Sequence, residues 1–191
     1  NEGVKNSNSE TAGVPHPSVN DEKLELTRPL VIGVVITARN GKVNLCPVNW
    51  QVVSTAWEKP LVVCVGLSKQ HLTLENIKLA KEFVYAYPSK EQLKDVLYCG
   101  TVSGRREDKL SKTKLKFIKS ETVTPPNLGR AVMNFECKVH AMVEMETFVI
   151  VIGKVIKIST SDKTALDKVY SLGGWDYGAI KEVETLQHGR V

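Results

Sequence analysis

Residues 68 to 73 place several polar groups that can bind an anion directly in front of a helix-like segment. An apolar, β-branched run at residues 61–67 predicts a buried strand before them, and apolar residues at helical spacing come after them. Thr73 is therefore predicted to be the N-cap of that helix. A helix start carries unpaired N–H groups and a partial positive charge, so the stretch can bind a phosphate. The contributing side chains would be Ser68, Lys69, Gln70, His71 and Thr73.

No single residue of this stretch can form such a site. A lysine about 4 Å from an anion gains only about 1 kcal/mol in water and roughly 4 kcal/mol near a protein surface. Several donors must converge, and the alternative from these residues alone is a solvated turn before an ordinary capped helix. The rest of the chain has to decide between the two.

The composition predicts one globular domain. The chain has 191 residues, of which 42% are hydrophobic and 25% are charged. Residues 1–26 are rich in Asn, Ser, Gly and Pro, so we expect a flexible N-terminal arm there and a folded domain at 27–191. No leader-like start and no apolar run of the roughly 18 residues that span a bilayer is seen, so we expect a cytoplasmic protein without a membrane partner.

Charge and cysteine spacing argue against nucleic-acid and metal sites. The net charge is +5, but the basic residues at 105–119 are mixed with acids and lack interleaved aromatic residues. A solvated basic face explains them, so no nucleic-acid partner is predicted. The four cysteines are widely separated, which favours buried reduced thiols over a metal site or a disulfide framework.

The pattern of elements predicts the α+β class, mainly β. Asn40 and Gly41 predict a hairpin turn, Pro47 predicts a sheet edge or a bulge, and Ser89 with Gln92 forms a capping box for a second helix. A third, short helix is expected from Asp108. Alternation at 133–145 predicts a strand with one buried and one wet face. The predicted strands lie at residues 30–37, 43–53, 61–67, 82–87, 133–145 and 148–158.

Strands that follow one another without βαβ alternation favour an antiparallel closed or split β-barrel with two or three short helices. The sequence has no Walker-type loop, no G-x-S-x-G elbow and no G-x-G-x-x-G, so no catalytic residue is assigned. Any chemistry would then belong to a bound cofactor.

The chain resembles the flavin reductase-like proteins with an FMN-binding split barrel, and in particular their flavoredoxin branch. The order and spacing of several segments between about residues 28 and 178 carry the resemblance, rather than one diagnostic motif. These segments are GKVNLCPVNW, PLVVCVGLS with KQHLTLENI, KEFVYAYPS, GTVSGRREDKL, NFECKVHAMVEMETFVIVIGKV and GGWDYG.

The resemblance implies FMN in a groove at a homodimer interface. The flavin ring would contact Asn49, Trp50, Gln51, Ser54 and Thr55. The phosphate would lie at Ser68, Lys69, His71 and Thr73, and the same site would be lined by Ser103, Gly104, Arg105 and Lys109. For Trp50 the alternative is a core or interface aromatic residue, and for Arg105 and Lys109 it is a solvated loop.

The implied activity is electron transfer from NAD(P)H through bound flavin to an acceptor. Two alternatives remain, which are a flavoredoxin-type carrier reduced by a protein partner and a flavin-binding module without turnover. Two departures from the family bear on them. Phe148 and Val149 stand where relatives commonly carry His-Thr near the flavin and nicotinamide, and STAWEKPLV has extra residues that blur the register of Ser54 and Thr55.

Overall fold

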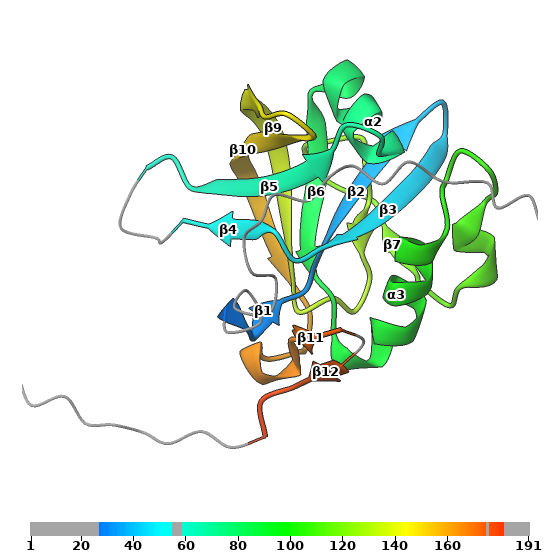
Figure 1. Ribbon diagram of the computed structural model, residues 1–191, viewed down its shortest axis with the longest axis vertical. Coiled ribbons are helices and arrows are strands. Elements are labelled where there is room, and N and C mark those ends of the chain that lie inside the picture. The colour runs from blue at the N-terminus through cyan, green and yellow to red at the C-terminus, as the bar shows by residue number, and fades with distance from the viewer. Residues whose placement is uncertain (1–26, 55–58, 175, 182–191) are drawn as a thin grey trace, which may run out of the picture.

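The computed structural model describes residues 27–54, 59–174 and 176–181, and a curled antiparallel sheet dominates it (Figure 1). The predicted arm at 1–26 and Thr55 lie outside these residues, so both stay predictions. The sheet has seven strands in the order β3-β2-β6-β9-β10-β5-β4. Their bounds are Gly33–Arg39 for β2, Lys42–Val48 for β3, Gln51–Val53 for β4, Val62–Ser68 for β5, Glu82–Tyr87 for β6, Met133–Glu144 for β9 and Phe148–Thr160 for β10.

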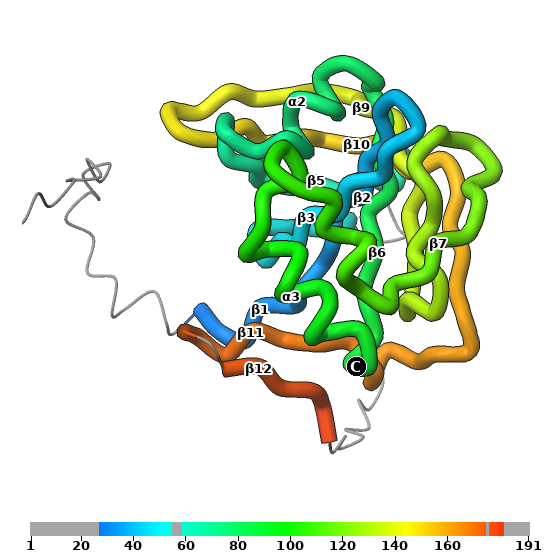
Figure 2. The backbone as a smooth tube through the Cα atoms, turned by 90° about the vertical axis from the view of Figure 1, so that its right-hand side faces the viewer, coloured from blue at the N-terminus to red at the C-terminus, as the bar shows by residue number. Residues whose placement is uncertain are grey.

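Two helices and several short elements complete the fold. Within the described ranges the α-helices are α2, Leu72–Ala80, and α3, Leu93–Thr101, and neither is long and apolar enough to cross a membrane. β1 (Leu30–Val31), β11 (Tyr170–Gly173) and β12 (Asp176–Gly178) form a small sheet below the large one, and β7 (Phe117–Ile118) pairs with β8 (Asn127–Leu128) (Figure 2). Single 3₁₀ turns lie at Lys90–Gln92, Lys109–Lys112 and Ala165–Asp167.

The second predicted strand, 43–53, is two strands on opposite edges of the sheet. It breaks at Asn49 and Trp50; β3 then pairs with β2, whereas β4 pairs with β5 at the other edge. The sheet must curl to bring these edges together, which confirms an antiparallel split barrel. Pro47 lies on the edge strand β3, one of the two positions predicted for it.

Two apolar clusters hold this sheet. Inside the curl, β5 and β10 pack their buried valines against the rings of Phe83, Tyr85 and Phe135. A Cβ at Gly153 would lie 2.5 Å from the Phe83 ring, so only glycine fits there. On the other side of β2 and β6, a second cluster packs beneath α3 through Val96 and Cys99.

Local turn signals are confirmed, with one exception at α2. Asn40 and Gly41 have φ angles of 50° and 74° and join β2 to β3. The Ser89 capping box opens the 3₁₀ turn before α3, and Asp108 caps the 3₁₀ turn that follows it. The predicted Thr73 cap is wrong, because α2 begins at Leu72 with His71 as N-cap, and no side chain caps it. The Thr73 hydroxyl instead accepts a hydrogen bond from Asn44 Nδ2 at 2.9 Å.

The prediction of one buried and one wet face along residues 133–145 is wrong in both halves of β9. Asn134 and Glu136 belong to the predicted wet face, yet both are buried. Residues 120–128 cover them, and the Glu136 carboxylate accepts bonds from the N–H groups of Glu121 and Thr122 and from Asn127. Burial of a carboxylate is tolerated here because several donors surround it. Beyond the register shift at Val139–Ala141 the two faces exchange, because Met142, predicted to be wet, packs against the inner core, whereas Val143 and Met145, predicted to be buried, are exposed.

Candidate functional site

The bend between β5 and α2, residues 68–73, contains backbone N–H groups that have no acceptor among the described residues. Within it, His71 N–H donates to Ser68 O at 3.0 Å, and Lys69 N–H donates to Thr147 O at 3.1 Å. The first-turn N–H groups of Leu72 and Thr73 have no acceptor in the described part of the chain. Because no side chain caps α2, these groups and the helix dipole are free to bind an anion.

Lys69 and His71 set the charge of the bend. The Lys69 ammonium is half-exposed and lies 3.7 Å from Glu144, a carboxylate that Lys78 also contacts at 3.0 Å. Burial, together with the Lys109 ammonium, lowers the pKa of His71. His71 is thus mainly neutral at pH 7, and Lys69 supplies the full positive charge.

Cys46 closes the inner side of the bend. Its Sγ lies 4.0 Å from His71 Nδ1, and sequence reasoning did not select it. Burial raises the pKa of the Cys46 thiol, and the Lys109 ammonium and the Thr73 hydroxyl offset only part of that shift. Cys46 is therefore a neutral thiol that packs beside the bend, in line with the predicted reduced cysteines.

The β3–β4 junction places Trp50 flat on the sheet. Trp50 is 45% exposed, so it is not a core residue of this chain. A Cβ at Gly66 would lie 2.7 Å from its ring, and its ring centroid is 6.1 Å from that of Phe148. Phe148 in turn pairs with Ser68, the first residue of the bend. The two aromatic side chains therefore form an apolar wall next to the bend with its unpaired N–H groups.

The other predicted flavin contacts differ in how free their side chains are. Gln51 Oε1 accepts a long bond from the Tyr87 hydroxyl at 3.5 Å, and Asn49 is exposed. Ser54 Oγ accepts the Val62 N–H at 2.9 Å and so continues the β4–β5 ladder. Ser54 thus has a structural bond already, and Gln51, which pairs with the buried Val65, lies on the core side of the sheet, whereas Asn49 is exposed.

The 103–109 loop reaches the bend through Asn44. A Cβ at Gly104 would lie 2.5 Å from Asn44 Oδ1, while Asn44 Nδ2 binds Thr73. Ser103 Oγ accepts the Arg105 N–H at 3.3 Å and shapes the loop. The structure therefore brings the loop and the bend together across one buried asparagine, which sequence reasoning did not include although it stands in the GKVNLCPVNW segment.

Lys109 does not lie in a solvated loop. It is buried, and its ammonium donates to Cys99 O at 2.8 Å and Val102 O at 3.3 Å at the end of α3. A cation at a helix C-terminus satisfies free carbonyls and interacts favourably with the helix dipole. Its bonds fix the loop on α3, and its charge still acts on Cys46 and His71.

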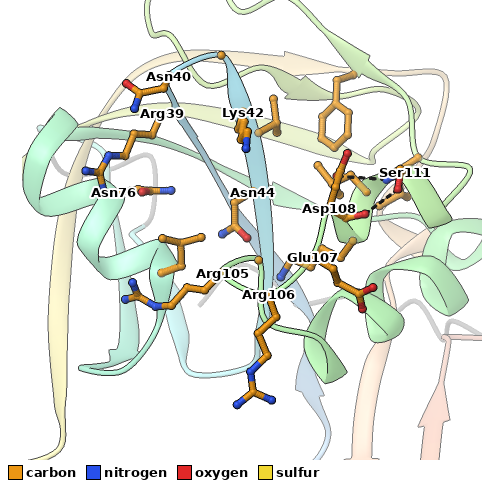
Figure 3. Close-up of a pocket in the computed structure, with 18 residues that line it drawn as sticks. Arg39, Asn40, Lys42, Asn44, Asn76, Arg105, Arg106, Glu107, Asp108 and Ser111 are labelled. Carbon is orange, nitrogen blue, oxygen red and sulfur yellow. Dashed lines mark hydrogen bonds between the residues drawn. The ribbon is translucent and has the colours of Figure 1, made fainter.

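Arg105 belongs to an ion-pair bridge between three elements. Arg105 and Arg39, from the loop and the β2–β3 hairpin, contact the two oxygens of Glu75 on α2 at 2.7 Å and 2.5 Å. Both arginines hold the pKa of Glu75 below its usual range. Behind this bridge lies a cleft of about 940 Å³, with Arg105, Gly104 and Lys109 among its lining residues (Figure 3). Ser68, Lys69, His71 and Thr73 do not line it.

Comparisons with known proteins agree with this architecture. The family model of the flavin reductase like domain matches residues 27–175. A similar protein of Archaeoglobus fulgidus, itself uncharacterized, is 32% identical over 139 residues, which are 73% of this chain and 77% of that protein.

Solved structures show the same fold at lower identity. The flavoredoxin from Methanosarcina acetivorans has a TM-score of 0.73 and 22% identity, covering 93% of this chain and 95% of its own. The FMN-binding protein from Thermus thermophilus with bound p-hydroxybenzaldehyde has a TM-score of 0.77 and 21% identity, covering 94% and 99%. With the family model matching most of its length, this chain belongs to the flavin reductase-like family.

Proposed function

We propose that this protein binds FMN and passes electrons from NAD(P)H through the bound flavin to an acceptor. The observation that carries the proposal is the uncapped start of α2, where the N–H groups of Leu72 and Thr73 have no acceptor among the described residues, in a bend that follows the Trp50–Phe148 aromatic pair and contains Lys69. The family match and the printed names of the similar structures, a flavoredoxin and an FMN-binding protein, support the choice of flavin.

The residues of the site fit FMN. The ribityl phosphate would bind the Leu72 and Thr73 N–H groups and the Lys69 ammonium, because charge-assisted bonds to phosphate are the stronger ones. Trp50 and Phe148 would cover the flat ring, and the exposed Asn49 would bind its polar edge. Bound FMN supplies hydride and single-electron transfer; the chain binds, orients and shields it.

A homodimer is part of the proposal. Residues paired across strands share one face of the sheet, and Ile150 pairs with Gly66 on one side and Val143 on the other. The outer face, as we name this surface, consists of Trp50, Val52, Cys64, Gly66, Ala141, Val143, Ile150 and Ile152. All of these residues are apolar or glycine, and Trp50, Val52 and Val143 are 45%, 61% and 46% exposed. A continuous apolar surface next to Trp50 favours a second copy that encloses the flavin ring.

Phe148 favours a second candidate function, a carrier of the flavoredoxin type that a protein partner reduces. Its ring stands beside Trp50 and offers no hydrogen bond to a nicotinamide. A module that binds flavin without redox turnover is the third candidate.

One experiment separates the reductase from the carrier and also tests flavin binding. The purified chain is loaded with FMN, freed of excess flavin, and mixed anaerobically with NADH or NADPH while the visible flavin band is followed. Bleaching by a nicotinamide is the expected result. Loss of the band only with dithionite, followed by reoxidation by an added redox protein, would favour the carrier. A protein that retains no flavin would contradict all three.

A further inference from the structure

Four buried polar side chains join the first part of α2 to the β2–β3 hairpin. Asn44 Nδ2 donates to Thr73 Oγ1 at 2.9 Å, and Asn76 Nδ2 donates to Thr37 Oγ1 at 3.0 Å. Thr37 and Asn44 pair directly across the hairpin, and Thr73 and Asn76 lie three residues apart on one face of α2. The hairpin therefore holds α2 through two buried hydrogen bonds, and loss of either would leave a buried polar group without its partner.

Asn44 also contacts the 103–109 loop, at Gly104. A Cβ at Gly104 would lie 2.5 Å from Asn44 Oδ1 and 3.2 Å from Leu72 Cδ2, so the loop backbone lies directly against β3 and the start of α2. A contact of 2.5 Å is too short to persist, so any side chain at this position would push the loop and Asn44 apart. Figure 3 shows Asn44 between the helix and the loop that carries Arg105, and Arg105 forms its ion pair with α2. The loop is thus held close to α2 at two consecutive residues.

The two segments that Asn44 separates are the two sides of the proposed phosphate site. The unpaired N–H groups of Leu72 and Thr73 lie on one side, and Ser103 and Gly104 lie on the other. Hydrogen bonds to a phosphate need donors at about 3 Å, so the separation of the two sides decides how many donors one phosphate can reach. Asn44 is 7% exposed, and it therefore acts through the groups that it holds rather than by direct contact with a ligand.

We propose that Asn44 is a positioning residue, which sets the separation between the start of α2 and the 103–109 loop and thereby the preference of the protein for FMN over riboflavin. This inference rests on the proposed function, because it requires the FMN phosphate to bind at the bend. Asn76 offers a matched comparison, since it makes a buried bond of the same kind between α2 and the hairpin but three residues further from the helix start.

Fluorescence titrations of the full chain with FMN and with riboflavin test the proposal, because the ratio of the two affinities isolates the phosphate. Asn44→Ala should weaken FMN binding about tenfold and leave riboflavin binding unchanged, since the first-turn N–H groups of α2 would move away from the phosphate. Asn76→Ala is the control. Urea unfolding should show a similar loss of stability in both variants, whereas the affinity ratio of Asn76→Ala should stay at the value of the parent.

Gly104→Ala tests the same contact from the loop side and does not remove a buried hydrogen bond. Its new Cβ would press on Asn44 Oδ1, so we expect FMN binding to weaken about tenfold, again without an effect on riboflavin. In the double variant Asn44→Ala/Gly104→Ala the truncated side chain leaves room for the Cβ. FMN affinity should then be close to that of Asn44→Ala alone, which is the non-additivity expected of two residues in contact.

Several results would overturn the role of Asn44. An equal fall of the affinity ratio in Asn44→Ala and Asn76→Ala would show that the buried bonds only support the fold. Additive losses in the double variant would show that Asn44 and Gly104 act independently. A parent protein that binds FMN and riboflavin equally would remove the phosphate site but leave flavin binding intact, whereas a parent that binds neither would contradict the proposed function and this inference together.

Discussion

The buried carboxylate of Glu136 fixes the segment that covers β9. Loss of solvent raises the pKa of such a group, but the bonds from Thr122, Glu121 and Asn127 outweigh this effect and lower the pKa of Glu136 below its usual value. A depressed pKa stabilises the folded state above the pKa of the unfolded chain. That contribution is lost as the pH falls through the folded pKa.

Glu136→Gln should therefore destabilise the protein most at neutral pH. The amide group would turn a donor toward donors that have no other acceptor, at a cost of about 1–3 kcal/mol. Urea unfolding at several pH values would measure the difference between variant and parent, which should narrow on acidification. Glu146→Gln, at an exposed position, is the control. A difference that stays constant from neutral to acid pH would contradict the role of the carboxylate charge.

The bend before α2 combines local features that the sequence predicts with contacts that it does not. The polar stretch and the helix after it follow from residue order. The residue order does not reveal that Thr73 fails to cap the helix. That outcome depends on Asn44, which comes from a distant strand and donates a hydrogen bond to the Thr73 hydroxyl. With that hydroxyl accepting from Asn44, the backbone and Lys69 are left as the main donors to an anion.

Lys69→Ala should weaken FMN binding about five- to tenfold, near 1 kcal/mol, because it removes one half-exposed charge from the phosphate. Fluorescence titration with FMN and with riboflavin measures the effect, and riboflavin, which has no phosphate, should bind both proteins equally. Lys78→Ala is a close control, since Lys78 shares Glu144 with Lys69 but lies a helix turn or more away from the bend. Equal losses of affinity for riboflavin and for FMN would show that the phosphate does not bind at Lys69.

Short-range signals in the sequence predicted most of the helices, strands and turns. The features that were not predicted depend on contacts between residues far apart in the chain. The Asn40–Gly41 turn and the Ser89 capping box depend on a few neighbouring residues, and both are present. The split of residues 43–53 between the two sheet edges depends on barrel closure, which no local pattern encodes. The same holds for Lys109, whose acceptors on α3 are defined only by the folded loop. The candidate residues came from the family resemblance, and their ligand contacts stay predictions.

At the scale of the whole molecule, the curl of the sheet separates two apolar surfaces. Its inner face is filled by the core, so alternate residues of β5, β9 and β10 must point outward. On a strand that faces water these positions would be polar, yet here they form the outer face next to Trp50 and Phe148. Such a surface on a curled sheet is typical of an interface between subunits.

Val143→Lys should convert the proposed dimer into a monomer. The residue pairs with Ile150 at the β9 side of the outer face, and a buried, unpaired ammonium there would weaken association at least about tenfold, or roughly 1.4 kcal/mol. Sedimentation velocity at several concentrations gives the mass of parent and variant. Leu79→Lys controls for added charge, because Leu79 is 61% exposed on α2 and does not belong to the outer face. If the flavin ring lies against this interface, Val143→Lys should also lower flavin affinity, whereas Leu79→Lys should not. A parent protein that sediments as a monomer with flavin bound would show that one copy of the barrel suffices.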